Sequence, residues 1–137
     1  MYNKYRDRVQ FLTIYIREAH PVDGWYLGKG PFKALMKLAK MNAATDVYDP
    51  RKITERRAVA RDCEEALKYG MPTLVDEMDD EVNEAYAAWP TRLYLIGLDG
   101  RIAYHGGLGP FDFYPSKLGA AIEEYLGQME EAVSDKL

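Results

Sequence analysis

The chain has 137 residues, of which 47% are hydrophobic and 29% are charged, a composition typical of one globular domain with its own apolar core. Its net charge of −4 at pH 7 offers no overall basic face to a nucleic acid, and its longest apolar run, residues 11–16, is too short to cross a membrane. A single cysteine excludes an intramolecular disulfide, and the N-terminus has no apolar secretory segment, so we expect a cytoplasmic location.

The first fifty residues predict one strand followed by a loop. Residues 2–9 are typical of the last turns of a helix. Residues 10–16 are rich in β-branched and aromatic side chains, which favours a central strand covered on both faces. The Asp23-Gly24 pair indicates a turn, and residues 32–41 favour a short helix.

A helix is predicted over residues 54–69. Its apolar stripe consists of Ile53, Ala60, Cys63 and Leu67, and Gly70 supplies its stop signal. The same region holds the main basic cluster of the chain, interleaved with acidic residues, which is typical of a solvated helix face. The cluster consists of Arg51, Lys52, Arg56, Arg57 and Arg61.

The rest of the chain predicts a strand, a helix, a hairpin and a long final helix. Residues 72–75 form the short buried strand and residues 79–89 the helix. Residues 91–96 and 101–105 flank an Asp-Gly turn, which predicts a β-hairpin. A glycine-rich loop over residues 106–110 follows, and Ser116 is expected to cap the final helix.

This order of elements predicts an α/β fold with a mixed sheet flanked by helices. An antiparallel hairpin followed by a long helix is typical of the way a thioredoxin-like sheet closes. Since no linker or repeat interrupts the sequence, we expect a single domain over residues 1–137.

Glu18 and His20 follow the predicted central strand. Ligands collect at the carboxyl ends of strands in open α/β sheets. His20 could move protons near neutral pH, with Glu18 orienting it, provided that an extended backbone keeps both on one face. The alternative is a solvated glutamate beside a histidine that bonds a loop carbonyl.

Two further residues have competing interpretations. Pro90 precedes the hairpin, where a thioredoxin-like fold places a cis proline beside the active site; the alternative is a trans proline that begins an edge strand. Cys63 lies mid-helix and is expected to pack as a small, buried, slowly reacting hydrophobe. His20 and His105 have no ligand-spaced partners, so no metal site is predicted.

Four motifs, in order, resemble the iodothyronine deiodinase family over about residues 10–126. The most specific reads YIREAHPVDGW at residues 15–25. The others read VDEMDD at 75–80, AYAAWPTRLY at 85–94 and GGLGP at 106–110.

The resemblance implies a peroxiredoxin-like variant of the thioredoxin fold, with a cis peptide bond before Pro90, and a thiol or selenol oxidoreductase. The implied reaction removes iodide reductively from an iodinated phenol such as an iodothyronine. A thiol is the implied electron donor, with no other cofactor. By residue, the resemblance implies that Glu18 and His20 are catalytic, and that Trp25, Pro90 and Arg92 bind a small aromatic substrate.

The family's nucleophile, a cysteine or selenocysteine in an S-C-T-(Sec/Cys)-P-P segment, has no counterpart among the 137 residues. We therefore expect a shortened version of the fold that lacks the first strand and the nucleophile loop. The exposed edge that this leaves suggests a homodimer. Two hypotheses remain: a deiodinase-like reductase whose nucleophile lies upstream, or a non-catalytic redoxin-like binding or assembly module. An in-frame Cys or UGA codon upstream of Met1 would support the first.

Overall fold

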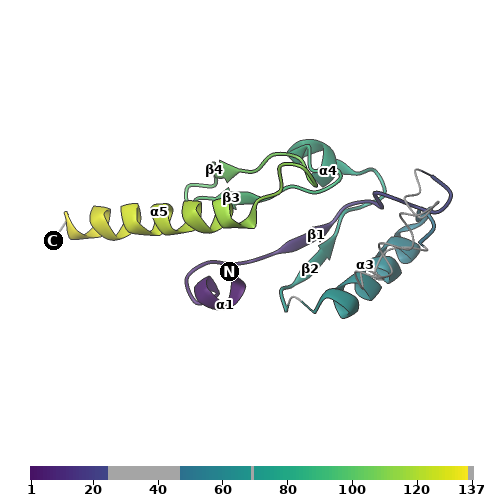
Figure 1. Cartoon of the computed structure of the whole chain (residues 1–137), viewed down its shortest axis with the longest axis horizontal. Helices are drawn as coiled ribbons and strands as arrows, with labels where there is room; N and C mark the ends of the chain where they lie inside the picture. The colour runs from purple at the N-terminus through teal and green to yellow at the C-terminus, as the bar shows by residue number, and fades with distance from the viewer. Residues whose placement is uncertain (25–46, 69, 136–137) are drawn as a thin grey trace. The chain divides into compact units, whose positions relative to one another are not determined.

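The computed structural model describes residues 1–24, 47–68 and 70–135. These residues form two compact units (Figure 1). The N-terminal unit comprises residues 2–89, and the C-terminal unit comprises residues 90–137 together with Met1.

In its described residues, the N-terminal unit contains two parallel strands and three helices, of which only one helix is long. In chain order they are α1 (Tyr2–Tyr5), β1 (Thr13–Tyr15), α3 (Ile53–Leu67), β2 (Thr73–Val75) and α4 (Glu81–Tyr86). The strands pair in register from Thr13 opposite Thr73 to Tyr15 opposite Val75. Helix α3 packs against β2, as Figure 1 shows.

Strand β1 is shorter and less covered than the sequence predicts. It spans three residues, and Ile14 and its partner Leu74 are 40% and 51% exposed. Coverage of the strand on both faces was therefore a wrong expectation. Periodicity within one segment cannot show whether a neighbour covers the second face.

Helix α3 confirms the predicted helix but not its stripe in full. Ala60 is 2% exposed, whereas Leu67, the last helical residue, is 61% exposed. The left-handed residue that ends the helix is Lys68, with φ of 48°, rather than the expected Gly70. Arg56 is buried, so the basic cluster is not a wholly solvated face.

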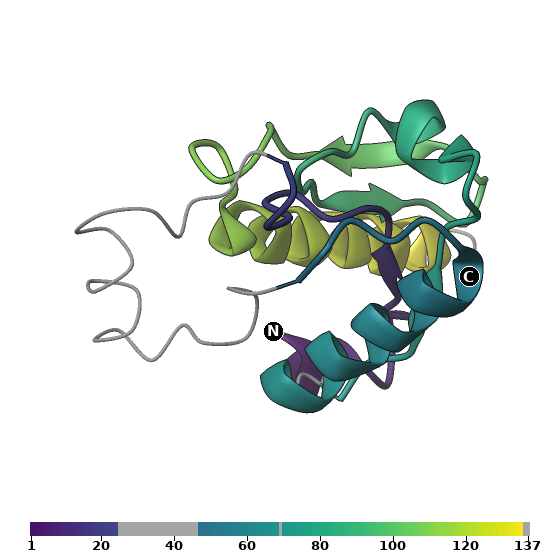
Figure 2. The ribbon, with the colours of Figure 1, turned by 90° about the vertical axis from the view of Figure 1, so that its right-hand side faces the viewer.

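The C-terminal unit is a hairpin with a long helix against it. Strands β3 (Tyr94–Ile96) and β4 (Ile102–His105) pair antiparallel, and α5 (Pro115–Ser134) lies along both, as Figure 2 shows. The core of this unit contains Leu95, Leu118 and Ile122. The Tyr125 hydroxyl accepts a hydrogen bond of 2.9 Å from the Leu98 amide, which fixes the helix to the hairpin turn.

Two local predictions in this region are wrong. Helix α5 begins at Pro115 after an N-cap at Tyr114, so Ser116 lies inside the helix and does not cap it. Proline suits this position because its missing N–H would have no helical partner. Among the described residues the cis peptide bond is at Gly109–Pro110, so the Trp89–Pro90 bond is trans, the ordinary preference of such bonds.

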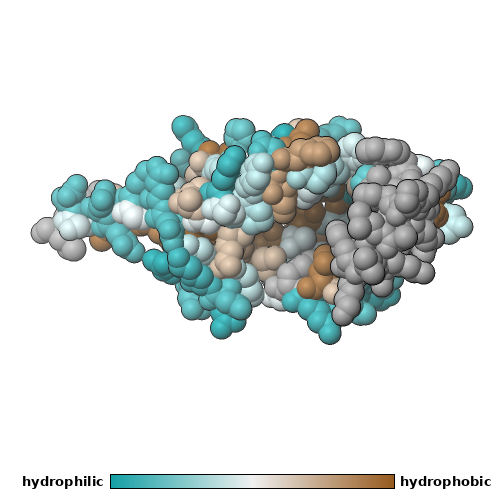
Figure 3. Space-filling model, viewed as in Figure 1, coloured by the Kyte–Doolittle hydropathy of each residue, from teal (hydrophilic) through white to brown (hydrophobic). Residues whose placement is uncertain are grey.

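The structure confirms a mixed α/β fold. In the described parts of the chain the strands form two two-stranded sheets, one parallel and one antiparallel. Apolar side chains remain exposed on each unit, among them Leu12 in the first and Ile102 in the second, and brown areas mark such residues in Figure 3. No helix in the described ranges is long and apolar enough to span a bilayer.

Candidate functional site

Glu18 is held by a tyrosine three residues before it. The Tyr15 hydroxyl donates a hydrogen bond of 2.7 Å to Oε2 of Glu18, and both side chains are half-buried. Burial, and then the bond to the Glu18 carboxylate, raises the pKa of Tyr15 well above its ordinary range. The phenol therefore keeps its proton and directs it at Glu18, a contact that the sequence analysis missed although both residues lie in the YIREAH motif.

The Glu18 carboxylate also acts electrostatically on Cys63, which lies on α3. Burial raises the pKa of the thiol, and the negative charges of Glu18 and Asp62 raise it further. The cysteine is half-buried, which is less than expected. A thiol with a raised pKa is a poor nucleophile, so the direction of the shift agrees with a slowly reacting side chain.

His20 lies in the segment that follows β1 and is half-buried. The strand ends at Tyr15, so the extended backbone that would place Glu18 and His20 on one face does not continue through both. The Val22 amide donates a hydrogen bond of 2.8 Å to the Val47 carbonyl, which fixes the chain just after His20.

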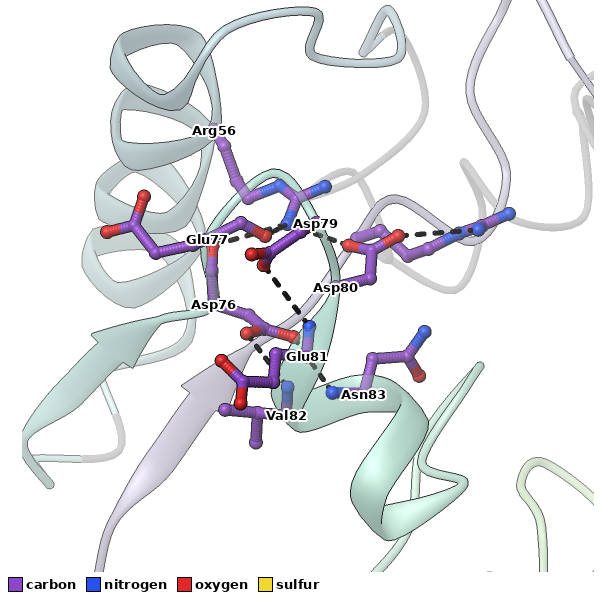
Figure 4. A network of polar contacts seen from close by, with 9 residues as sticks. Arg56, Asp76, Glu77, Asp79, Asp80, Glu81, Val82 and Asn83 are labelled. Carbon is purple, nitrogen blue, oxygen red and sulfur yellow. Dashed lines mark hydrogen bonds and ion pairs between the residues drawn. The ribbon is translucent and has the colours of Figure 1, made fainter.

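A polar network centred on Arg56 lies beside this segment (Figure 4). The Arg56 side chain is 4% exposed. Its Nη1 donates hydrogen bonds to the Asp76 and Glu77 carbonyls and forms a 2.8 Å ion pair with Asp80. Burying a charge is costly unless it is paired and hydrogen-bonded. Nη1 of Arg56 meets both conditions, whereas its buried Nε has no hydrogen-bond partner in the described structure.

The same network orders the start of α4. The Asp76 carboxylate accepts hydrogen bonds from the Val82 amide, at 3.1 Å, and the Asn83 amide, at 2.8 Å. A carboxylate that accepts from the first amides of a helix satisfies donors that the helix itself leaves unpaired. Asp76 therefore joins the end of β2 to α4 (Figure 4).

Arg17 links the network to the Glu18 segment. Its Nη1 lies 3.5 Å from Oδ2 of Asp80, and its guanidinium lies 5.5 Å from the centre of the Trp89 ring. Tyr15 thus holds the Glu18 side chain, and Arg17 ties the residue before Glu18 to Asp80 and Trp89.

Arg92 belongs to the C-terminal unit and lines a separate pocket. Its Nη1 donates a hydrogen bond of 3.3 Å to the Tyr94 hydroxyl, and its buried Nε has no hydrogen-bond partner in the described structure. The pocket has a volume of about 270 Å³. It is lined by Arg92, Tyr104, His105, Gly106, Gly107, Asp112 and Lys117.

The glycine-rich loop builds one side of this pocket. The Gly106 amide bonds to the Leu93 carbonyl and the Gly109 amide to the Thr91 carbonyl, so the loop is fastened on both sides of Arg92. A Cβ atom at Gly107 would collide with Asp112, and one at Gly109 with Thr91. Side chains are therefore excluded at these two loop positions for lack of space.

The structure places the predicted site residues in both units. Glu18 and His20 share one segment of the N-terminal unit, whereas Pro90 and Arg92 belong to the C-terminal unit. Trp25 and the helix expected over residues 32–41 lie outside the described residues. Within the described ranges, no group of three or more His, Cys, Asp or Glu side chains is arranged to hold a metal ion.

Comparison with known proteins identifies relatives along most of the chain. The family described as iodothyronine deiodinase matches residues 1–126. Thyroxine 5-deiodinase of Sparus aurata is 33% identical over 123 residues, covering 90% of this chain and 40% of the relative. The enzyme of Homo sapiens is 34% identical over 132 residues, covering 94% and 38%, and that of Aquarana catesbeiana is 31% identical over 122 residues, covering 87% and 39%.

The chain thus spans about two-fifths of the length of the curated relatives it matches. The match begins before β1, includes the Tyr15–Glu18 pair and extends to α5. It covers well over half of the chain. This chain belongs to the iodothyronine deiodinase family.

Proposed function

We propose that this chain provides the proton-donating and substrate-binding part of a deiodinase-like oxidoreductase with a thioredoxin-like fold. Its substrate would be an iodinated phenol that carries an acidic group. The observation that carries the proposal is the 2.7 Å hydrogen bond between Tyr15 and Glu18, in the segment that also holds His20. Family membership supports the reaction type.

The proposed reaction is reductive. A thiolate or selenolate attacks iodine, the carbon–iodine bond breaks, and the aryl carbon takes a proton. A thiol then reduces the resulting sulfur–iodine or selenium–iodine bond, which releases iodide and forms a disulfide or selenenylsulfide. A second thiol completes the two-electron balance by regenerating the nucleophile.

The residues of this chain would handle the proton and the substrate. His20 would donate the proton, Glu18, held in place by Tyr15, would be the second catalytic residue of the same segment, and Arg92 would bind the acidic group. Trp25 and Pro90 would contact the aromatic rings. The nucleophile would come from a segment outside these 137 residues, and we propose a cytoplasmic homodimer that uses thiol reductants.

A non-catalytic redoxin-like module is the second candidate. The observation that favours it is the raised pKa of Cys63, the one thiol in the sequence, because a protonated thiol attacks iodine poorly. On this alternative, ligand binding would survive without any turnover.

Substitution of Glu18 tests the proposal, in the chain preceded by the family segment that carries the nucleophile. Losing a positioned proton-transfer group costs about 100-fold or more in rate, so Glu18→Gln and His20→Ala should each lower kcat on that scale. Glu65→Gln, on the exposed surface of α3, is the matched control and should leave kcat unchanged. Equal rates for Glu18→Gln and the control would contradict the proposal.

A further inference from the structure

The Arg92 pocket contains a second cation that the proposed function does not use. Lys117 lines the pocket from the first turn of α5 and forms a 3.7 Å ion pair with Asp112. Both side chains are more than half exposed, and such exposed pairs contribute little to stability. The Lys117 ammonium also lies 4.4 Å from the centre of the Tyr114 ring. Its ion pair with Asp112 can therefore be exchanged for one with a ligand at small cost.

The position of Lys117 is unfavourable for the helix that carries it. The N-terminus of a helix has a partial positive charge and prefers acidic residues, yet the first turn of α5 contains none. Lys117, Arg92 and the helix end all contribute positive potential to one pocket, and Asp112 is the one carboxylate among its lining residues. An anionic group is the ligand that this arrangement favours.

The size of the pocket suits the end of a ligand. Its volume of about 270 Å³ is just below the range of about 300–1,000 Å³ that holds a whole drug-sized molecule. Arg92 has a buried Nε without a partner, and it forms no ion pair in the described structure. A carboxylate in the pocket would supply this guanidinium with a charge partner.

We propose that Lys117 is a specificity-determining residue. It gives up its ion pair with Asp112 and, together with Arg92, binds the carboxylate of an arylalkanoic acid. The inference rests on the proposed function in one respect: it takes Arg92 as the residue that meets the acidic end of the substrate. Asp112 competes with the ligand for Lys117. The two residues therefore act on affinity in opposite directions.

Binding of para-hydroxyphenylacetate and its neutral amide, followed by the amide signals of Gly106 and Gly107 in NMR titrations of the 137-residue chain, tests this. Lys117→Met should weaken binding of the carboxylate about three- to tenfold and leave the amide unchanged. Asp112→Asn should tighten binding of the carboxylate about two- to threefold.

The ion pair between Arg101 and Asp99 provides the matched control. It lies in the same unit, is similarly exposed at 3.9 Å and does not line the pocket. Arg101→Met and Asp99→Asn should leave both affinities unchanged. Unaltered backbone spectra and the unchanged amide affinity show that Lys117→Met has not disturbed the fold.

Three results would overturn the inference. They are no binding of the carboxylate to the unmodified chain, an equal effect of Lys117→Met on both probes, and an effect of Arg101→Met as large as that of Lys117→Met. Because binding needs no nucleophile, these results are separate from the rate measurements with Glu18→Gln. Selective binding by the 137-residue chain, with no turnover by the chain preceded by the nucleophile segment, would remove the proposed function and leave the pocket assignment standing.

Discussion

Replacing Arg56 with methionine should destabilise the protein strongly, because it leaves Asp80 without its closest charge partner. The Arg56 side chain is 4% exposed and that of Asp80 is 17% exposed. Removing one partner of a buried ion pair costs about 3–5 kcal/mol, since the remaining charge stays out of water. Two carbonyl groups, of Asp76 and Glu77, also lose their donor.

The neighbouring arginine supplies a control on the same helix. Arg57 forms a 3.2 Å ion pair with Glu77, but the two side chains are 59% and 62% exposed. Exposed pairs of this kind are worth about 0.2–1 kcal/mol. Arg57→Met removes the same charge and adds the same side chain, so its effect measures everything except burial.

Urea denaturation followed by circular dichroism measures both variants. Stability differences follow from the shift in midpoint at constant slope. We expect Arg56→Met to lose at least about 3 kcal/mol, a large part of the total of about 5–15 kcal/mol of a typical domain, and Arg57→Met to lose less than about 1 kcal/mol. Equal losses for the two variants would refute the reasoning that burial sets the cost.

Three further predictions concern ionisation, reactivity and association. Because the folded-state pKa of Tyr15 is raised, stability should fall as pH rises through about 10, where the unfolded phenol ionises and the folded one does not. Tyr15→Phe should flatten that part of the pH–stability curve, and an unchanged curve would contradict this prediction. At neutral pH, Cys63 should react with a thiol reagent far more slowly in native than in urea-unfolded protein. Equal rates in the two states would make Cys63 a candidate nucleophile again. The exposed faces of Ile14 and Leu74 should promote self-association, detectable by light scattering at micromolar concentrations, and a strictly monomeric mass there would exclude it.

The sequence predicted the β3–β4 hairpin and helix α3 well, because residues within each element determine its formation. The hairpin follows from its Asp-Gly turn, and Gly100 does adopt the left-handed conformation, with φ of 77°. Helix α3 was predicted to within two residues at each end, because its period and length are unmistakable in the sequence.

Features that depend on distant partners could not be predicted. Arg56 belongs to a basic cluster in sequence, and its burial depends on carbonyls and a carboxylate that lie 20 or more residues away. The length of β1 depends on the three residues of β2 that pair with it. The resemblance pointed to Glu18, but its bond to Tyr15 required coordinates.

Iodide release from an iodothyronine, with a dithiol as reductant, measures whether the reaction needs both His20 and a nucleophile from outside the 137 residues. We expect the 137-residue chain to release no iodide. Adding a Ser-Cys-Thr-Cys-Pro-Pro segment and its preceding strand should produce iodide release, and His20→Ala should abolish that activity. Iodide release at enzymatic rates by the 137-residue chain, stopped by Cys63→Ser, would contradict these expectations.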